Sequence, residues 1–149
     1  MTADKIKQML DACYLAKRVR DLLPELPDGV TPSYIQYLDR IRKLQDMNKR
    51  VKVSDISDEL KLPRPGVTRM VKEMEAKGYI TKETSEEDAR ITYITITPKG
   101  AELSDKYDRN YYDWLVQYMD DISDEEADCM INTIEKFYKI MSERRITIE

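Results

Sequence analysis

The most constraining feature of the sequence is residues 53–100, VSDISDELKLPRPGVTRMVKEMEAKGYITKETSEEDARITYITITPKG. Apolar residues at helical spacing predict a short helix and a longer one, separated by a turn at residues 62–65. Gly78 fits the position just beyond the end of the second helix, where a positive φ is required. β-Branched and aromatic residues then predict two strands, 79–84 and 91–97, joined by a polar loop.

This order of elements is that of a winged helix-turn-helix, whose second helix usually enters the DNA major groove. Ser54 is the expected N-cap of the first helix, with Ile56 and Leu60 facing the core. Pro65 suits the first turn of the second helix, because an N–H at that position would have no partner within the helix. The stretch therefore indicates a DNA-reading head.

Helical patterns flank this head on both sides. Apolar spacing predicts a helix over residues 4–23, and Thr31 followed by Pro32 marks the start of the next helix. Thr97-Pro98 repeats that start signal and predicts a long helix over residues 98–121, while Ser123 opens a final helix in capping-box form. The core face of the second helix comprises Tyr34, Tyr37, Leu38, Ile41 and Leu44.

The predicted fold class is mainly α, an α+β winged helix with six helices and a two- or three-stranded β-wing. The 149 residues are enough for a single domain with a core of its own. Residues 49–97 are expected to form the head. Residues 1–48 and 98–149 are expected to form a helical body.

Composition argues against several classes of protein. The chain has no histidine and only two cysteines, so histidine metal sites and histidine-based catalysis are excluded and no disulfide framework exists. There is no glycine-rich phosphate loop either. No apolar run approaches the ~20 residues of a membrane span, and the N-terminal residues lack a signal segment. We therefore expect a cytoplasmic protein that is not an enzyme, needs no cofactor or metal, and has no membrane partner.

The charge distribution is compatible with DNA binding although the net charge is −4. Residues 49–100 hold 11 Lys and Arg against 9 Asp and Glu, whereas the last 49 residues hold 6 against 13. A mildly basic head on an acidic body predicts modest non-specific affinity, with the acidic part kept away from DNA.

The candidate base-reading residues lie at the N-terminal end of the second helix of the head. Arg pairs bidentately with guanine, and Thr offers a hydroxyl or a methyl group. Lys72 and Lys77, further along the helix, suit phosphate contacts. The alternative is that these are ordinary solvated charges on an amphipathic helix. The helix start carries Arg64, Pro65, Gly66, Thr68 and Arg69.

The loop between the two strands carries a second candidate, Arg90. An arginine at a wing tip can enter the narrow, electronegative minor groove. Asp88, two residues earlier, can hold that side chain by a charge-assisted hydrogen bond. The alternative is a loop salt bridge of little energetic value.

The head motif, the wing residues 85–90 and the closing Thr-Pro-Lys-Gly of residues 97–100 together resemble the MarR family of transcription regulators. The resemblance covers essentially the whole chain and implies a homodimer, built on the terminal helices, that binds double-stranded DNA at a pseudo-palindromic operator, most often as a repressor. Carried over to this sequence, the recognition-helix contacts fall on Arg64, Pro65, Gly66, Thr68, Arg69 and Lys72, and the wing contacts fall on Asp88 and Arg90.

Two departures from the family pattern concern the recognition helix. Pro63 stands where relatives usually have a capping Ser or Asp. Pro65-Gly66 replaces positions that often carry hydroxyl side chains, so base readout at the helix tip is expected to be thinner.

The resemblance also implies release from DNA by a small aromatic effector. Aromatic walls with polar tips suit such a ligand, although the same side chains can simply pack the core and the dimer seam. The candidate pocket residues are Tyr14, Tyr34, Tyr37, Tyr111 and Trp114.

Two other interpretations stay open. Cys13 and Cys129 lie on the first and last helices, and some relatives sense peroxides through a first-helix thiol. Cys13 is out of register with that thiol when the chains are matched at Thr31 and Tyr37, and free cysteine often serves as a small apolar residue. The other interpretation is a winged-helix protein-interaction module without DNA binding.

Overall fold

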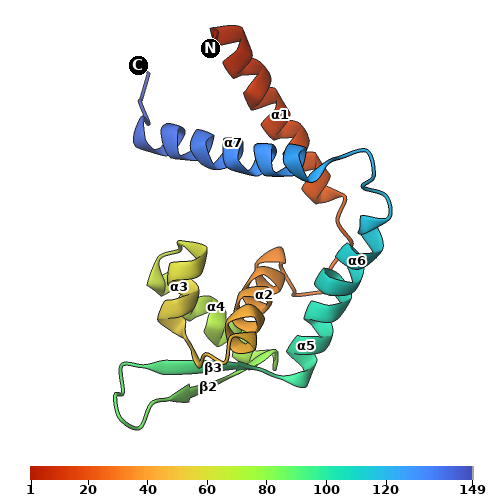
Figure 1. Cartoon of the computed structure of the whole chain (residues 1–149). Coiled ribbons are helices and arrows are strands. Elements are labelled where there is room, and N and C mark those ends of the chain that lie inside the picture. The colour runs from red at the N-terminus through yellow and green to blue at the C-terminus, as the bar shows by residue number, and fades with distance from the viewer. Residues whose placement is uncertain (149) are drawn as a thin grey trace. The chain divides into compact units, whose positions relative to one another are not determined.

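The computed structural model describes residues 1–148 (Figure 1). The chain divides into two compact units, Met1–Arg109 and Asn110 onward. Within the described residues, none of the helices combines the length and apolar character needed to cross a lipid bilayer. The first unit contains α1 (Ala3–Asp21), α2 (Pro32–Asp46), β1 (Val51–Lys52), α3 (Val53–Leu60), α4 (Arg64–Ala76), β2 (Ile80–Thr84), β3 (Thr92–Ile96), α5 (Pro98–Ser104) and the π-helical segment η1 (Asp105–Arg109). The second unit contains α6 (Asn110–Val116) and α7 (Asp124–Glu143).

The core of the first unit forms where α2 packs against the helix-turn-helix, the sheet and α5. The predicted apolar face of α2 is buried along its whole length, which confirms the 3.6-residue spacing as a core signal. Partners come from α3, α4 and the strands. The fully buried members of this core include Tyr34, Leu38, Ile41, Ile56, Val67, Val71, Met74, Ile80 and Ile94.

The sheet has three antiparallel strands in the order β1-β3-β2, and the short β1 supplies the third strand of the wing. Ile94 of β3 pairs with Val51 on one side and with Lys82 on the other. Because side chains alternate along a strand, the buried Val51 and Ile94 define the inner face, and Tyr93 lies on the outer face.

The start of α3 differs from the expectation. The helix begins at Val53, and the Asp55 carboxylate accepts a hydrogen bond of 2.9 Å from the backbone N–H of Lys52. Ser54 therefore lies inside the first turn and is not the cap, because Asp55 reaches back in the manner of a capping box. At the other end, Lys61 adopts a left-handed φ of 52°, and the Ser57 hydroxyl donates to the Leu62 carbonyl across the turn.

The predicted long helix over residues 98–121 was wrong in its length. Helical structure runs through α5, η1 and α6 and ends at Val116. The Gln117 side chain donates to the Trp114 carbonyl at 2.8 Å, and the Tyr118 N–H turns to the Leu115 carbonyl instead. The Gln117 side chain thereby satisfies one of the carbonyls that the helix end leaves without a partner in the helix.

In the second unit, α7 begins as predicted. The Ser123 hydroxyl accepts from the Glu126 N–H at 3.1 Å, and the Glu126 carboxylate accepts from the Ser123 N–H at 2.9 Å. Both backbone donors at the helix start are thereby satisfied. The helix has no buried residue, and the same holds for α1 in the first unit.

Candidate nucleic-acid interface

The recognition helix α4 presents its predicted DNA contacts to solvent. Val67, Val71 and Met74 are buried and anchor the opposite face of the helix. Pro63 is the N-cap and makes no side-chain capping bond, so the first N–H groups of α4 are available to an anionic group. The exposed set comprises Arg64, Pro65, Gly66, Thr68, Arg69 and Lys72.

Lys77 does not join this set, although the sequence suggested a phosphate contact. Its ammonium group donates to the Gly29 carbonyl at 2.6 Å and to the Tyr34 hydroxyl at 2.9 Å. The hydrogen bond to Tyr34 raises the pKa of Lys77. The side chain therefore ties the end of α4 to the segment that precedes α2. Its role depends on a contact between residues 48 positions apart, which helix periodicity does not reveal.

In the wing loop, the Arg90 side chain is hydrogen-bonded to the carboxylate of Asp88. Arg90 Nε donates to Asp88 Oδ1 and Nη2 donates to Asp88 Oδ2, both at 3.0 Å. The Arg90 backbone N–H also donates to Asp88 Oδ1. These bonds lower the pKa of Asp88 and raise that of Arg90. The Arg90 side chain is 89% exposed, so the pair orients the charge without withdrawing it from solvent.

The loop that carries Arg90 is ordered by its own hydrogen bonds. The Ser85 hydroxyl accepts from the N–H groups of Glu87 and Asp88 at 3.3 Å. Ser85 and Ile91 close the loop through a backbone bond of 2.9 Å, and Ile91 N–H donates to the Asp88 carbonyl at the same distance. The wing tip is thus a compact turn with a defined direction.

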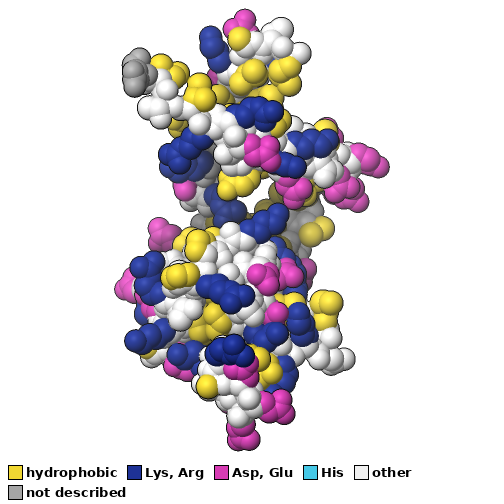
Figure 2. All heavy atoms as spheres, turned by 90° about the vertical axis from the view of Figure 1, so that its left-hand side faces the viewer, with side chains coloured by type: hydrophobic (Ala, Val, Ile, Leu, Met, Phe, Trp, Pro, Cys, Tyr) yellow, Lys and Arg dark blue, Asp and Glu magenta, His cyan; other side chains and the backbone are white. Residues whose placement is uncertain are grey.

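Charges of both signs cover the head. Figure 2 shows many Lys and Arg side chains over the lower half of the visible face, where the head lies, interspersed with Asp and Glu. The exposed Glu86 and Glu87 lie next to Arg90 in the wing loop. Such a surface gives weak attraction to phosphates in general and makes productive contact dependent on orientation.

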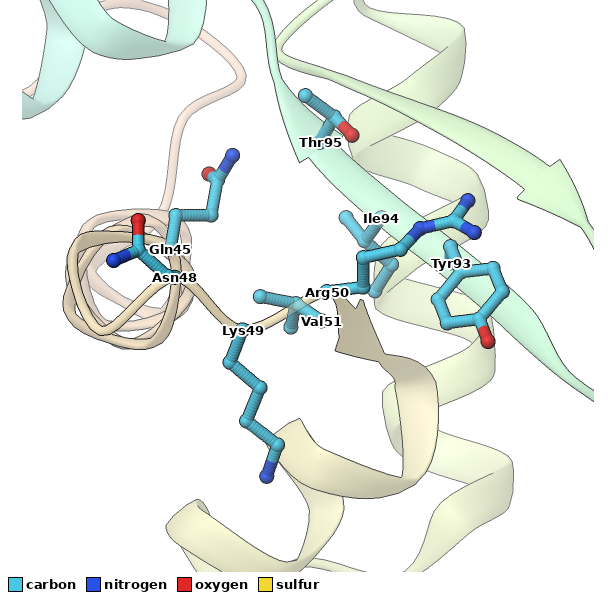
Figure 3. Close-up of a pocket in the computed structure, with 8 residues that line it drawn as sticks. All are labelled: Gln45, Asn48, Lys49, Arg50, Val51, Tyr93, Ile94 and Thr95. Atoms are coloured by element: carbon cyan, nitrogen blue, oxygen red, sulfur yellow. The ribbon is translucent and has the colours of Figure 1, made fainter.

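The outer face of the sheet carries a stack that sequence reasoning missed. The guanidinium carbon of Arg50 lies 3.7 Å from the centre of the Tyr93 ring (Figure 3). Arg50 Nη2 is also 3.6 Å from the Glu83 carboxylate. Arg50 immediately precedes β1, whereas Tyr93 is on β3 and Glu83 on β2, so the stack crosses all three strands. No local motif marks it, because it forms only when the sheet is assembled.

A shallow pocket of about 230 Å³ adjoins this stack, between the end of α2 and strands β1 and β3 (Figure 3). The aromatic residues predicted for an effector pocket do not line it. Its lining consists of Gln45, Asn48, Lys49, Arg50, Val51, Tyr93, Ile94 and Thr95.

The five aromatic candidates lie in different surroundings. Tyr34 and Tyr37 are buried in the core of the first unit, and burial raises the pKa of Tyr37. Tyr14 is exposed on α1. Tyr111 and Trp114 belong to α6, where their ring centres are 5.9 Å apart and Trp114 also contacts Tyr118. Packing accounts for Tyr34 and Tyr37, whereas Trp114 is half exposed.

The two cysteines are free thiols. Cys13 is half-buried on α1, and Cys129 is exposed on α7. Among the described residues, no group of three or more His, Cys, Asp or Glu side chains is placed to hold a metal ion.

The geometry is that of a winged helix-turn-helix head, and sequence comparison gives the family. Residues 28–91 match the model of the MarR family. The organic hydroperoxide resistance transcriptional regulator of Bacillus subtilis is 30% identical over 107 residues, which are 69% of this chain and 71% of that protein. The chain belongs to the MarR family of transcriptional regulators, which agrees with the expectation that it is not an enzyme.

Two further relatives extend the comparison. The uncharacterised regulator YdgJ of Bacillus subtilis is 23% identical over 106 residues, and the match spans 71% of this chain and 62% of YdgJ. FabT of Streptococcus pneumoniae, solved in complex with DNA, superposes with a TM-score of 0.67 at 23% identity, covering 95% of this chain and 99% of FabT. The FabT match confirms the predicted fold class.

Proposed function

We propose that the protein is a transcriptional repressor that binds a pseudo-palindromic operator in double-stranded DNA as a homodimer. Residues 49–97 serve as the reading head, and residues 1–48 and 98–149 form the dimerisation body. The observation that carries the proposal is the combination of an exposed, basic start of α4 with Arg90 held outward by Asp88. The DNA complex formed by FabT supports the same use of the fold.

The two halves of the head have separate tasks. Arg64, Thr68 and Arg69 contact base edges in the major groove, where bidentate arginine contacts distinguish guanine. Pro65 and Gly66 let the helix tip approach the groove closely, and Lys72 contacts a phosphate. Arg90 enters the adjacent minor groove, which it reads by width and potential.

The exposed apolar residues of α1 and α7 support the dimer. Neither helix buries a residue, which is unusual for a monomeric protein of this size. A two-fold pair would cover these faces and set two recognition helices about 34 Å apart, one turn of DNA. The apolar residues include Ile6, Leu10, Leu15 and Val19 on α1 and Met130, Ile131, Ile134, Tyr138 and Met141 on α7.

Selection from random or genomic DNA fragments tests the proposal. The wild-type protein should enrich a sequence of near two-fold symmetry. Arg69→Ala and Arg90→Ala should each weaken binding to it by about 1–3 kcal/mol, with sequence preference relaxed at the contacted position. A module used only for protein contacts would enrich nothing and would be insensitive to both substitutions, and that result would overturn the proposal.

A small aromatic effector is the form of regulation that the surface chemistry favours. Tyr112 and Trp114 of α6 and Tyr118, just after the helix, are each about half exposed, so aromatic surface is available in the second unit. Of the candidate aromatic residues, Tyr111 and Trp114 lie in this unit and are the proposed contacts. A panel of aromatic acids should raise the Tm and release the operator; a flat response across the panel would count against this mode.

Thiol sensing is the second candidate, and the name of the hydroperoxide resistance relative is what favours it. Cys129 is exposed, and Cys13 is partly so. If either thiol is the sensor, peroxide should release the wild-type protein from its operator, and the double substitution to serine should abolish that response. Equal release of both proteins would exclude thiol sensing.

A further inference from the structure

The side chain of Glu75 links the recognition helix α4 to the root of the wing, residues 80–83. This residue lies in the last turn of α4, and its carboxylate contacts the middle residue of β2, Lys82. Glu75 Oε2 accepts a hydrogen bond of 3.1 Å from the backbone N–H of Lys82, and Oε1 lies 3.5 Å from the Lys82 ammonium group. One carboxylate thus holds both the main chain and the side chain of the same strand residue.

The bond to the main chain gives this contact its importance. β2 is an edge strand, since the strand order is β1-β3-β2. The N–H groups on the edge that points away from β3 have no partner in the sheet. Glu75 satisfies one of them from the recognition helix. A side-chain ion pair alone would leave the strand free to shift, whereas a hydrogen bond to the peptide fixes the position of the backbone.

The opposite side of the ribbon is also held. On the outer face, Arg50 stacks on Tyr93 and reaches Glu83, the residue next to Lys82. The β-ribbon is therefore fixed at its root from both faces. Beyond the root, the hydrogen bonds of Ser85 order the wing tip. The position of the strand backbone at Lys82 therefore influences the position of Arg90.

We propose that Glu75 is a positioning residue for DNA binding, which sets the angle between the recognition helix and the wing so that α4 and Arg90 occupy adjacent grooves together. Glu75 itself does not contact DNA. The inference rests on the proposed DNA-binding function and adds a residue that the family resemblance did not point to. Pre-organisation of the two contacts lowers the ordering cost of binding.

A double-mutant cycle on the full-length protein tests this role, with the operator selected above as the probe. Arg90→Ala should weaken binding about tenfold and Glu75→Ala about fivefold. The double variant should bind no more weakly than Arg90→Ala alone, since Glu75 acts only through Arg90. Glu75→Gln retains an acceptor for the Lys82 N–H and should bind nearly as well as wild type. Glu59→Ala, which removes an exposed carboxylate of α3, controls for the loss of negative charge.

Amide hydrogen exchange at Lys82 supplies a readout that needs no DNA. Exchange should accelerate in Glu75→Ala and stay slow in Glu75→Gln and Glu59→Ala. Unchanged exchange in Glu75→Ala, unchanged operator affinity in that variant, or full additivity with Arg90→Ala would each overturn the proposal. Failure of the wild-type protein to select any operator would instead overturn the proposed function, and the role of Glu75 with it.

Discussion

The Asp88 carboxylate grips the Arg90 guanidinium through two parallel hydrogen bonds of 3.0 Å while the arginine stays 89% exposed. The pairing therefore serves orientation, because a surface ion pair in water contributes little to stability. In the proposed complex Asp88 would bring negative charge close to DNA, so its contribution there would come from the direction that it gives to Arg90.

Asp88→Asn is expected to weaken operator binding by about threefold to tenfold even though it removes a negative charge from the interface. The amide keeps a single acceptor and loses the bidentate, charge-assisted grip. Fluorescence anisotropy with the selected operator measures the change. Glu86→Gln, in the same loop and without this partner, should bind equally well or slightly better. Stronger binding by Asp88→Asn would show that the carboxylate acts only as a repulsive charge.

Gly100→Ala should destabilise the first unit by about 1–3 kcal/mol. A Cβ at this buried position would lie 2.1 Å from the Tyr79 carbonyl oxygen, which belongs to the backbone and cannot rotate away. Gly66→Ala is the matched control, since a Cβ there meets nothing within 4 Å and should stabilise the helix by up to about 1 kcal/mol. Urea denaturation of both variants gives the two free energies. Equal stability of the two would contradict the close packing of α5 against Tyr79.

Features that depend on neighbouring residues are predictable from the sequence, whereas contacts between distant residues, such as that of Gly100 with Tyr79, are not. The amphipathic spacing of α2 and α4, the left-handed Gly78 and the Asp88–Arg90 pair each depend on residues close together in the sequence, so the sequence predicts them. The inward role of Lys77, the Glu75–Lys82 contact and the Arg50–Tyr93 stack depend on residues that approach only in the folded chain. At the end of α6 the Gln117 side chain donates to the Trp114 carbonyl, a contact that helical spacing in the sequence does not predict.

Lys72 and Lys77 should separate DNA affinity from stability, although both lie on the same helix. Lys72→Ala should weaken binding to all DNA sequences and reduce the slope of log K against log salt by about one, with no change in Tm. Lys77→Ala should lower the Tm, because the Gly29 carbonyl and the Tyr34 hydroxyl lose their donor. Its salt slope should stay that of the wild type. If Lys77→Ala reduced the salt slope and left the Tm unchanged, Lys77 would be a phosphate contact.

Asp108→Asn is expected to stabilise the protein at neutral pH. Burial, followed by the nearby Asp39, raises the pKa of Asp108 above its ordinary value. The native state therefore holds the proton more tightly than the unfolded state does, and native stability falls as the pH rises through the unfolded and then the native pKa. The variant removes that loss.

Thermal denaturation across pH tests the sign of this effect. The gain in Tm from Asp108→Asn should be largest near pH 7 and should fade on acidification, as Asp108 in the wild type takes up its proton. Asp113→Asn, on the exposed surface of α6, should show no such trend. A gain that persisted unchanged at low pH would mean that the benefit comes from packing of the amide and not from removal of a buried charge.

Ile131→Glu on α7 should convert the protein to a monomer. Ile131 is 56% exposed on a helix that buries no residue, so a charge there costs the isolated chain little but would be desolvated inside a dimer seam. Sedimentation velocity should show the lower mass, and far-ultraviolet circular dichroism should be unchanged. A monomer engages only one half-site, so operator affinity should fall about a hundredfold or more. Asn132→Glu places the same charge at the neighbouring polar position and should stay dimeric. If Ile131→Glu also remained dimeric with full affinity, the two-fold contact would have to lie elsewhere, and the apolar face of α7 would need another partner.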